Sequence, residues 1–259
     1  GTYSALAAMV TGRTPYWGMH LEEERKGTIL VKVEATLRTL SDYSALGYFA
    51  GDIAGLEIPV FDGISGRPSL EELKALSASI ATSGGVVMFH IPGVTPEART
   101  LEDAFGGEVP KDRVCFDDDE LKVVYEDLSS SPEENVDLVV LGCPHCSLKE
   151  LALIAEKIRG KKVNPNVKFI VCTAVGIKEI AERMGYVQII ESAGGMVICD
   201  TCPCIIASGG LIPKGISPGM TLATNSAKQA HYAAALLDVK TLFGNIDQCV
   251  SAAITGKWR

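Results

Sequence analysis

The eight cysteines of this 259-residue chain are the residues whose number and spacing most directly suggest chemistry. Five of them form two tight groups, Cys143 with Cys146, and Cys199 with Cys202 and Cys204. Small secreted chains use dense cysteines for disulfides, but here several lie in or beside apolar, strand-like runs of a large domain. The two groups therefore indicate ligands for a soft metal ion or an iron–sulfur cluster.

Three interpretations of these groups stay open. Both Cys-x2-Cys pairs have the spacing of a structural zinc site, although the second pair begins inside a predicted strand. The CPHC segment at residues 143–146 precedes a helix, as in an exposed redox dithiol, although the chain is too long for a thioredoxin domain. A cluster held by three thiolates would leave one iron open as a Lewis acid. We interpret Cys115 and Cys172 as small buried hydrophobic residues.

A second group that suggests chemistry is the TNSAK segment at residues 224–228. Ser226 stands at the predicted start of a helix, where a hydroxyl and free backbone N–H groups favour an anion, and Lys228 adds a cation. Together these residues predict a cradle for a carboxylate or phosphate group. The alternative is a plain helix cap followed by a solvated lysine.

These segments depend on the elements that carry them. The pattern predicts strands at residues 28–37, 58–61, 86–90, 136–141, 167–172, 187–191 and 196–199, and helices at 41–54, 70–83, 121–128, 148–159 and 178–184. Strands that alternate with helices at this spacing predict an α/β fold with parallel sheets flanked by helices. Ligands of such sheets bind beyond the carboxyl ends of strands, where the segments 142–146, 200–204 and 91–96 are expected.

Composition and charge limit the possible partners. Hydrophobic residues make up 47% of the chain and charged residues 22%, which is the range of globular proteins. The formal net charge is -8, and no run of Lys and Arg is long enough to follow a phosphate backbone, so we expect no nucleic-acid partner. The longest apolar stretches are far shorter than a membrane span. We expect a soluble, cytoplasmic protein that does not contact a membrane.

Several motifs, in order, resemble the large subunit of the aconitase X family across nearly the whole chain. They are GRTPYWGMHL, PVFDG, HIPGVTPEA at residues 90–98, LGCPH at 141–145, CDTC at 199–202, TNSAK at 224–228 and FGNIDQCVSAAITG. The resemblance implies an aconitase-like fold and a dehydratase of a 3-hydroxy acid that uses an iron–sulfur cluster. The activities of the family are the dehydration of mevalonate 5-phosphate and of cis-3-hydroxy-L-proline, and the sequence does not choose between them.

The resemblance also assigns roles to residues. Cys143 and Cys202 correspond to two of the three cluster ligands, and the third ligand lies in an N-terminal region that has no counterpart here. Asn225, Ser226 and Lys228 would bind the acidic group of the substrate, and His145 would orient substrate or a cluster thiolate. The catalytic base is not identified.

The resemblance further implies missing parts. The chain opens without Met and almost directly into a helical pattern, so we expect it to lack the front of its large subunit. A small subunit or a small swivelling domain would complete the site. We expect residues 1–62 and 205–259 to form part of a domain shared with the missing region, and residues 63–204 to form an α/β domain that carries the cysteine loops. The alternative function is a non-catalytic metal-binding or scaffold fragment of such an enzyme.

Overall fold

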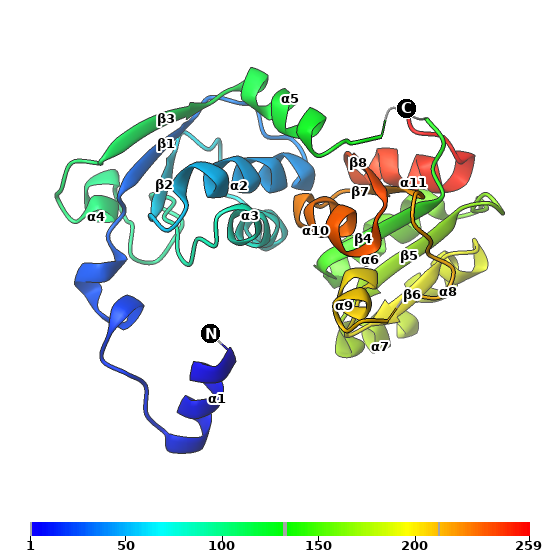
Figure 1. Cartoon of the computed structure of the whole chain (residues 1–259), viewed down its shortest axis with the longest axis horizontal. Helices are drawn as coiled ribbons and strands as arrows, with labels where there is room; N and C mark the ends of the chain where they lie inside the picture. Colours follow the sequence, from blue (N-terminus) through cyan, green and yellow to red (C-terminus); the bar gives the residue numbers. More distant parts are fainter. Residues whose placement is uncertain (1, 132–133, 212) are drawn as a thin grey trace.

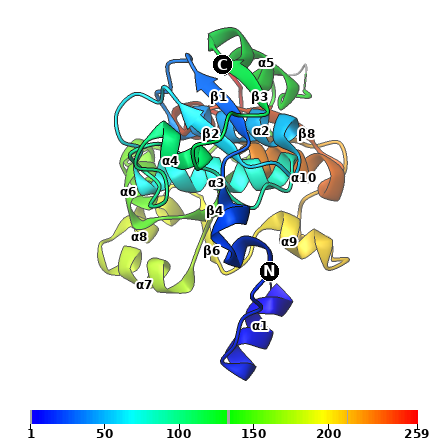
Figure 2. The same cartoon turned by 90° about the vertical axis from the view of Figure 1, so that its left-hand side faces the viewer.

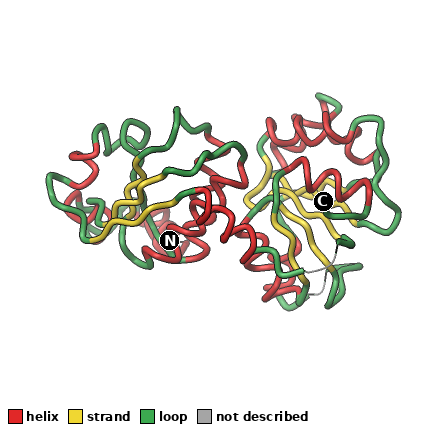
Figure 3. Tube along the Cα trace, turned by 90° about the horizontal axis from the view of Figure 1, so that it is seen from above, coloured by secondary structure: helices red, strands yellow, loops and turns green. Residues whose placement is uncertain are grey.

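The computed structural model describes residues 2–131, 134–211 and 213–259, which form two α/β lobes that lie side by side (Figure 1). Gly1, on which the expectation of a truncated front rests, lies outside the described residues. The view from above shows strands in both lobes, with helices between them where the lobes meet (Figure 3). Parallel sheets flanked by helices are the fold class that the sequence predicts.

The first lobe is built on a three-stranded parallel sheet of order β2-β1-β3. Its strands are β1 (Ile29–Val33), β2 (Pro59–Asp62) and β3 (Asp112–Phe116), and its helices are α2 (Leu40–Ala54), α3 (Leu70–Ser83), α4 (Leu101–Phe105) and α5 (Asp118–Asp127). Capping boxes begin α2 at Thr39 and α3 at Ser69, the latter as its sequence predicts. Gly47 lets α2 and α3 approach closely, since a Cβ there would lie 2.4 Å from the Leu76 carbonyl oxygen.

The second lobe is built on a five-stranded parallel sheet of order β6-β5-β4-β7-β8. Its strands are β4 (Leu138–Cys146), β5 (Lys168–Thr173), β6 (Met196–Cys199), β7 (Thr221–Thr224) and β8 (Lys240–Phe243). Its helices are α6 (Leu148–Ile158), α7 (Val175–Arg183), α8 (Tyr186–Ser192), α9 (Pro203–Ser208), α10 (Ala227–Leu237) and α11 (Ile246–Thr255). From β4 the chain adds β5 and β6 on one side, and it then adds β7 and β8 on the other side. The boundary between β4 and β7 is the topological switch point, where ligands of doubly wound sheets bind at the carboxyl ends of the strands.

The helices α2 and α3 of the first lobe cover this switch point. The Ser41 hydroxyl donates to the Gly244 carbonyl oxygen at 2.9 Å, and the Ala227 backbone N–H donates to the Ser44 hydroxyl at 2.9 Å. Both contacts are buried, and Ala227 and Phe243 of the second lobe belong to the same hydrophobic core as α2. The first lobe is therefore packed against the edge of the sheet where loops carry ligands.

Two predicted strands are wrong. Residues 187–191 lie in helix α8, because Val187 and Ile190 point into the core at the i, i+3 spacing of a helix, and this burial outweighs their preference for strands. Residues 86–90 contribute only a single bridge, between Val60 and His90, and Val87 is 71% exposed. The segment 91–96 follows this bridge in the first lobe and lines none of the cavities at the switch point.

Strand pairing divides the chain differently from the expected domains. Residues 1–62 were expected to share a domain with 205–259, but β1 and β2 pair with each other and with β3, while β7 and β8 extend the sheet of β4. The physical reason is hydrogen bonding of β7 to β4, which places the C-terminal part of the chain beside the cysteine loops.

The N-terminal helix α1 (Thr2–Thr11) extends away from both sheets (Figures 1 and 2). It leads to two short 3-10 turns, η1 (Gly18–His20) and η2 (Glu22–Arg25), which precede β1. Among the described residues, no helix is long and apolar enough to cross a membrane.

Candidate functional site

The cysteine loop, residues 142–146 at the end of β4, is where the site begins. Strand pairing with β5 shifts register between Leu141 and Cys146, so the intervening residues bulge out of the sheet. Gly142 has a φ of +93°, and a Cβ there would lie only 2.1 Å from the Cys172 carbonyl oxygen. Only glycine fits this position, and it turns Cys143 out of the sheet at the switch point.

Cys143 faces a cavity of about 500 Å³ between the end of β4 and the helices α9 and α10. The lining combines thiols, one histidine, one lysine and an apolar wall: Gly142, Cys143, Pro144, His145, Cys202, Cys204, Ile205, Ser208, Lys228, Tyr232 and Leu236. Four of the six residues assigned to the site from sequence, Cys143, His145, Cys202 and Lys228, therefore line a single cavity.

The thiols of Cys143 and Cys202 line the same cavity and shift each other's pKa through a thiol–thiol hydrogen-bonding interaction. This hydrogen bond is the main reason that the pKa of Cys202 lies well below that of a free thiol, and the backbone N–H groups of Ile205 and Cys204 lower it further. Cys202 is the N-cap of α9, where such groups favour an anion. The pKa of Cys143 is raised by donation to Cys202 and by burial. The interaction therefore favours the thiolate form of Cys202 over that of Cys143.

Lys228 is the cation of this cavity. It lies in the first turn of α10, and its charge favours the thiolate form of Cys143. Its ammonium forms no hydrogen bond or ion pair with the residues that the structure describes, although it is partly buried. An anionic ligand in the cavity could therefore bind it without displacing a protein partner.

His145 joins the two cysteine segments. Its Nε2 lies 3.3 Å from the Thr201 carbonyl oxygen, one residue before Cys202. The ring is partly buried and lines the cavity. This contact ties the cysteine loop to the start of α9.

Asn225 and Ser226 do not line the cavity that Cys143 faces. They line a separate cavity of about 20 Å³, which shares Gly142, Cys143 and Pro144 with the main one. The Ser226 hydroxyl donates to the Cys143 carbonyl oxygen and accepts from the Gln229 N–H at 3.1 Å, as the N-cap of α10. The cradle that the sequence predicts is therefore split, with Lys228 in the large cavity and Ser226 beneath the cysteine loop.

The remaining cysteines of the two groups are placed differently. Cys146 lies in the hydrophobic core on the opposite side of β4, and burial raises its pKa. The two sulfurs of the CPHC segment therefore do not face one ligand, as a zinc knuckle or a redox dithiol would require. Cys204 lines the cavity, but its sulfur accepts a hydrogen bond from the Gln229 side chain at 3.1 Å, and burial raises its pKa to about 12. All eight cysteines are free.

The donor set suits part of a three-cysteine cluster. Cys143 and Cys202 are neighbours in space and line the same cavity, and thiolates are the ligands that iron–sulfur clusters use. Within the described part of the chain, no group of three or more His, Cys, Asp or Glu side chains is arranged to hold a metal ion. The residues present therefore fit two thiolate positions of such a cluster.

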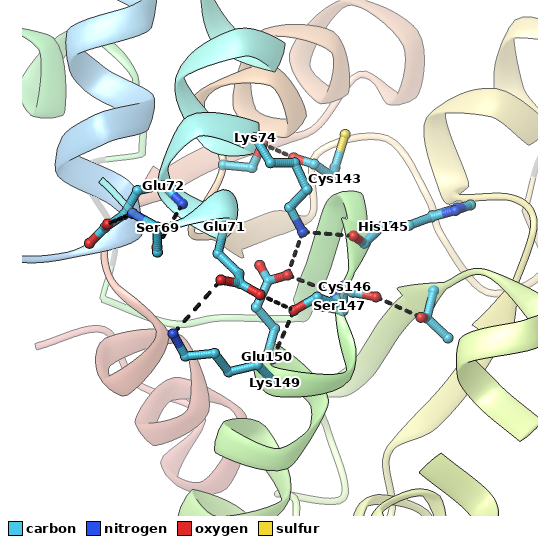
Figure 4. Close-up of polar contacts among 12 residues, drawn as sticks. Ser69, Glu71, Glu72, Lys74, Cys143, His145, Cys146, Ser147, Lys149 and Glu150 are labelled. Carbon is cyan, nitrogen blue, oxygen red and sulfur yellow. Dashed lines mark hydrogen bonds and ion pairs between the residues drawn. The ribbon is translucent and has the colours of Figure 1, made fainter. Parts of the chain in front are cut away.

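Several residues of the site carry no signal in the sequence. Figure 4 shows Lys74 and Glu71, which come from α3 of the first lobe and contact the backbone or side chains of the cysteine loop and the start of α6. They are separated from the loop by about seventy positions, and nothing in their local pattern distinguishes them from solvated residues of an amphipathic helix. The N-cap of α6 at Ser147, by contrast, can be read from the local sequence, since serine directly before a predicted helix is a common cap.

Comparison with known proteins gives a consistent result for both lobes. Residues 27–126 match the description "Aconitase X second domain", and residues 136–255 match "Aconitase X third domain". The two matches correspond to the two sheets of the structure.

Individual proteins that resemble this chain agree with the two domain matches. The chain is 39% identical over 254 residues to the phosphomevalonate dehydratase large subunit of Methanocaldococcus jannaschii, with 96% of the chain and 60% of the relative covered. It is 37% identical over 255 residues to the cis-3-hydroxy-L-proline dehydratase of Pseudomonas aeruginosa, with 97% and 43% covered. The crystal structure of Thermococcus kodakaraensis aconitase X in its holo-form superimposes with a TM-score of 0.83 at 32% identity, with 98% of the chain and 62% of that structure covered. The chain spans about half the length of the curated relatives that it matches.

Proposed function

The chain belongs to the aconitase X family, and we propose that it forms the cysteine-bearing part of a hydro-lyase that removes water from a 3-hydroxy acid. The observation that carries this proposal is the pairing of Cys143 and Cys202 in one cavity with Lys228. The relatives at 37% and 39% identity are dehydratases of a hydroxylated amino acid and of a phosphorylated acid.

In this proposal Cys143 and Cys202 hold an iron–sulfur cluster, and a third thiolate comes from outside this chain. Bound there, the cluster would supply an open iron as a Lewis acid for the leaving hydroxyl group. Lys228 binds the carboxylate or phosphate of the substrate with its ammonium group. His145 keeps the cysteine loop aligned with the start of α9 through its contact with Thr201.

Ser226 contributes by support rather than by contact with substrate. Its hydroxyl is engaged by the Cys143 carbonyl oxygen and by the Gln229 N–H. Asn225 lies beside it in the small cavity under the loop. We therefore assign Lys228 to the acidic group of the substrate, and we assign Ser226 and Asn225 to the backbone that carries Cys143.

The cavity also supports the proposal of a partner. Three of its apolar residues are widely exposed, Ile205 at 62%, Leu236 at 41% and Tyr232 at 36%. Large hydrophobic side chains around a binding cavity commonly mark a surface that another segment covers. A small subunit or swivelling domain of the enzyme would close the site over them and exclude water. Free thiols throughout the chain suit a reducing cytoplasm.

The test begins with an anaerobic preparation of the complete protein with all of its subunits. Its iron and sulfide contents are measured, and so is its dehydration of mevalonate 5-phosphate and of cis-3-hydroxy-L-proline. We expect iron and sulfide in the wild type and loss of most of both in Cys143→Ser and Cys202→Ser. Cys115→Ser is the matched control, because that thiol is exposed on the first lobe; the interpretation of Cys115 as a buried residue is wrong. Iron and sulfide with no dehydration of either substrate would favour the non-catalytic scaffold. Absence of iron in the wild type would contradict the proposal.

A further inference from the structure

Lys74 crosses from the first lobe to the cysteine loop. Its ammonium donates to the His145 carbonyl oxygen at 2.8 Å and forms an ion pair with Glu150 (Figure 4). Lys74 lies on α3, whereas His145 is the penultimate residue of β4 and Glu150 lies in the first turn of α6. One cation therefore binds both the loop and the helix that follows it.

Glu150 depends on this cation. Its side chain is only 9% exposed, and its carboxylate already accepts from the Ser147 backbone N–H at 2.7 Å as part of the capping box of α6. A carboxylate in this setting is costly to bury without a counter-charge. Ser147 in turn donates to Glu71 of α3 at 2.9 Å, which gives a second link between the lobes.

The cysteine loop is held through its backbone carbonyl groups. The Cys143 carbonyl oxygen accepts from the Ser226 hydroxyl, that of His145 from Lys74, and that of Cys146 from the Thr173 hydroxyl at 2.7 Å. Ser226 and Thr173 belong to the same lobe as the loop, and each is a neutral donor. Lys74 is the one of these three donors that is charged and comes from the other lobe.

We propose that Lys74 is a positioning residue that fixes the path of the cysteine loop and so keeps the Cys143 sulfur beside the Cys202 sulfur. This proposal rests on the proposed function for its consequence in catalysis, since it makes the first lobe part of the ligand site. The geometric claim concerns the two thiols alone. It can therefore be tested without a cluster and without substrate.

The probe is phenylarsine oxide, which bridges two neighbouring thiols by forming two S–As bonds with release of water. The complete, metal-free, reduced protein is treated with it, and peptides bridged between Cys143 and Cys202 are quantified by mass spectrometry over time. The variants are Lys74→Met, Lys74→Gln and Lys74→Arg. The matched control is Lys157→Met, because Lys157 is 26% exposed against 28% for Lys74 and also forms an ion pair, with Asp247, away from the loop.

We expect Lys74→Met and Lys74→Gln to slow bridging about tenfold or more, because a shift of about 1 Å in reacting atoms has effects of this size. Lys74→Arg should restore most of the rate, since it keeps a charged donor. Lys157→Met should bridge as the wild type does. If Lys74→Met does not fold, Lys74→Gln decides the question. Wild-type bridging rates in folded Lys74→Met or Lys74→Gln, or equal slowing in Lys157→Met, would overturn the proposal.

Anaerobic loading of the same proteins with iron and sulfide separates this inference from the proposed function. Wild-type protein that bridges rapidly but binds no iron would contradict the cluster and leave the role of Lys74 to be read from the variants. Protein that binds iron equally well with Met at position 74, and bridges at the wild-type rate, would contradict the positioning role alone.

Discussion

The Ser226 hydroxyl donates a hydrogen bond to the Cys143 carbonyl oxygen, although the two residues are 83 positions apart in the sequence. The same hydroxyl caps α10 by accepting from the Gln229 N–H. One side chain thus joins the cysteine loop at the end of β4 to the segment after β7, and these two strands lie on either side of the topological switch point. This contact explains how a helix cap can influence a thiol in the neighbouring loop.

Replacement of Ser226 by Ala should separate these two effects. Loss of the cap should lower the free energy of unfolding by about 1 kcal/mol, and loss of the donor should slow bridging of Cys143 and Cys202 by an arsenical. Asn245→Ala is the control, because Asn245 caps α11 in the same way without contact to the cysteine loop. Urea unfolding and the bridging assay measure the two quantities. Equal bridging rates in both variants would show that the Ser226 hydroxyl serves the helix alone.

Gly142→Ala should be among the most damaging small substitutions in the chain. A Cβ at a φ of +93° is strained and would overlap the Cys172 carbonyl oxygen, so we expect a loss of about 2–5 kcal/mol in the free energy of unfolding. Gly160 has a φ of +72°, and a Cβ there would meet open space. In Gly160→Ala, backbone strain alone should therefore lower the free energy of unfolding by about 1 kcal/mol. Denaturant unfolding compares the two variants. A loss at position 142 no larger than at position 160 would show that the strand can shift away from the clash.

Lys228→Met should affect binding more than folding. The substitution keeps the aliphatic stem and removes a charge that has no protein partner among the described residues, so the melting temperature should stay level or rise slightly. In the complete enzyme, KM should rise at least about tenfold, or ~1.4 kcal/mol, for the lost charge-assisted contact. Lys122→Met, which removes an exposed lysine from α5, serves as the control. A marked fall in melting temperature with unchanged KM would identify Lys228 as a structural residue.

Cys202 should be the most reactive thiol of the cavity at neutral pH in metal-free protein. The thiolate is the nucleophile, and the pKa of Cys202 is lowered while that of Cys204 is raised to about 12. As pH rises from acid to neutral, alkylation of Cys202 should therefore reach its plateau first, while Cys204 is still unreactive. The profile is measured by mass spectrometry of iodoacetamide-treated protein.

Cys143→Ala supplies the matched control for this profile. It removes the hydrogen bond that lowers the pKa of Cys202 most, so the Cys202 profile should move to higher pH. A profile that does not move would assign the low pKa to the backbone N–H groups of α9 instead. A wild-type profile in which Cys204 reacts first would contradict the prediction.

Local patterns in the sequence were enough to predict the elements that carry the site. The apolar run before Gly142 predicts a strand followed by a cysteine loop. Ser69 predicts the start of α3 with its capping box, and Ser147 predicts the start of α6. These features depend on residues that are at most a few positions apart, so the local sequence determines them. The motifs around Cys143 and Cys202 similarly indicated the family, which the comparisons confirm.

Contacts between segments far apart in the sequence decided the remaining features of the fold and of the site. Residues 187–191 have the composition of a strand but form α8, because the core beside β5 and β6 accepts a helix there. Lys74 has the pattern of an ordinary helix residue, and only the packing of α3 against the end of β4 brings its ammonium to the His145 carbonyl group. Hydrogen bonding and burial are decided by which segments meet in space, and residues seventy or more positions apart carry no local record of that meeting. The sequence by itself therefore determined β1, β2, β4, β5 and β6 and the positions of the cysteines, but not β3, β7 and β8. The tertiary structure decided which thiols face each other and which cation holds them in place.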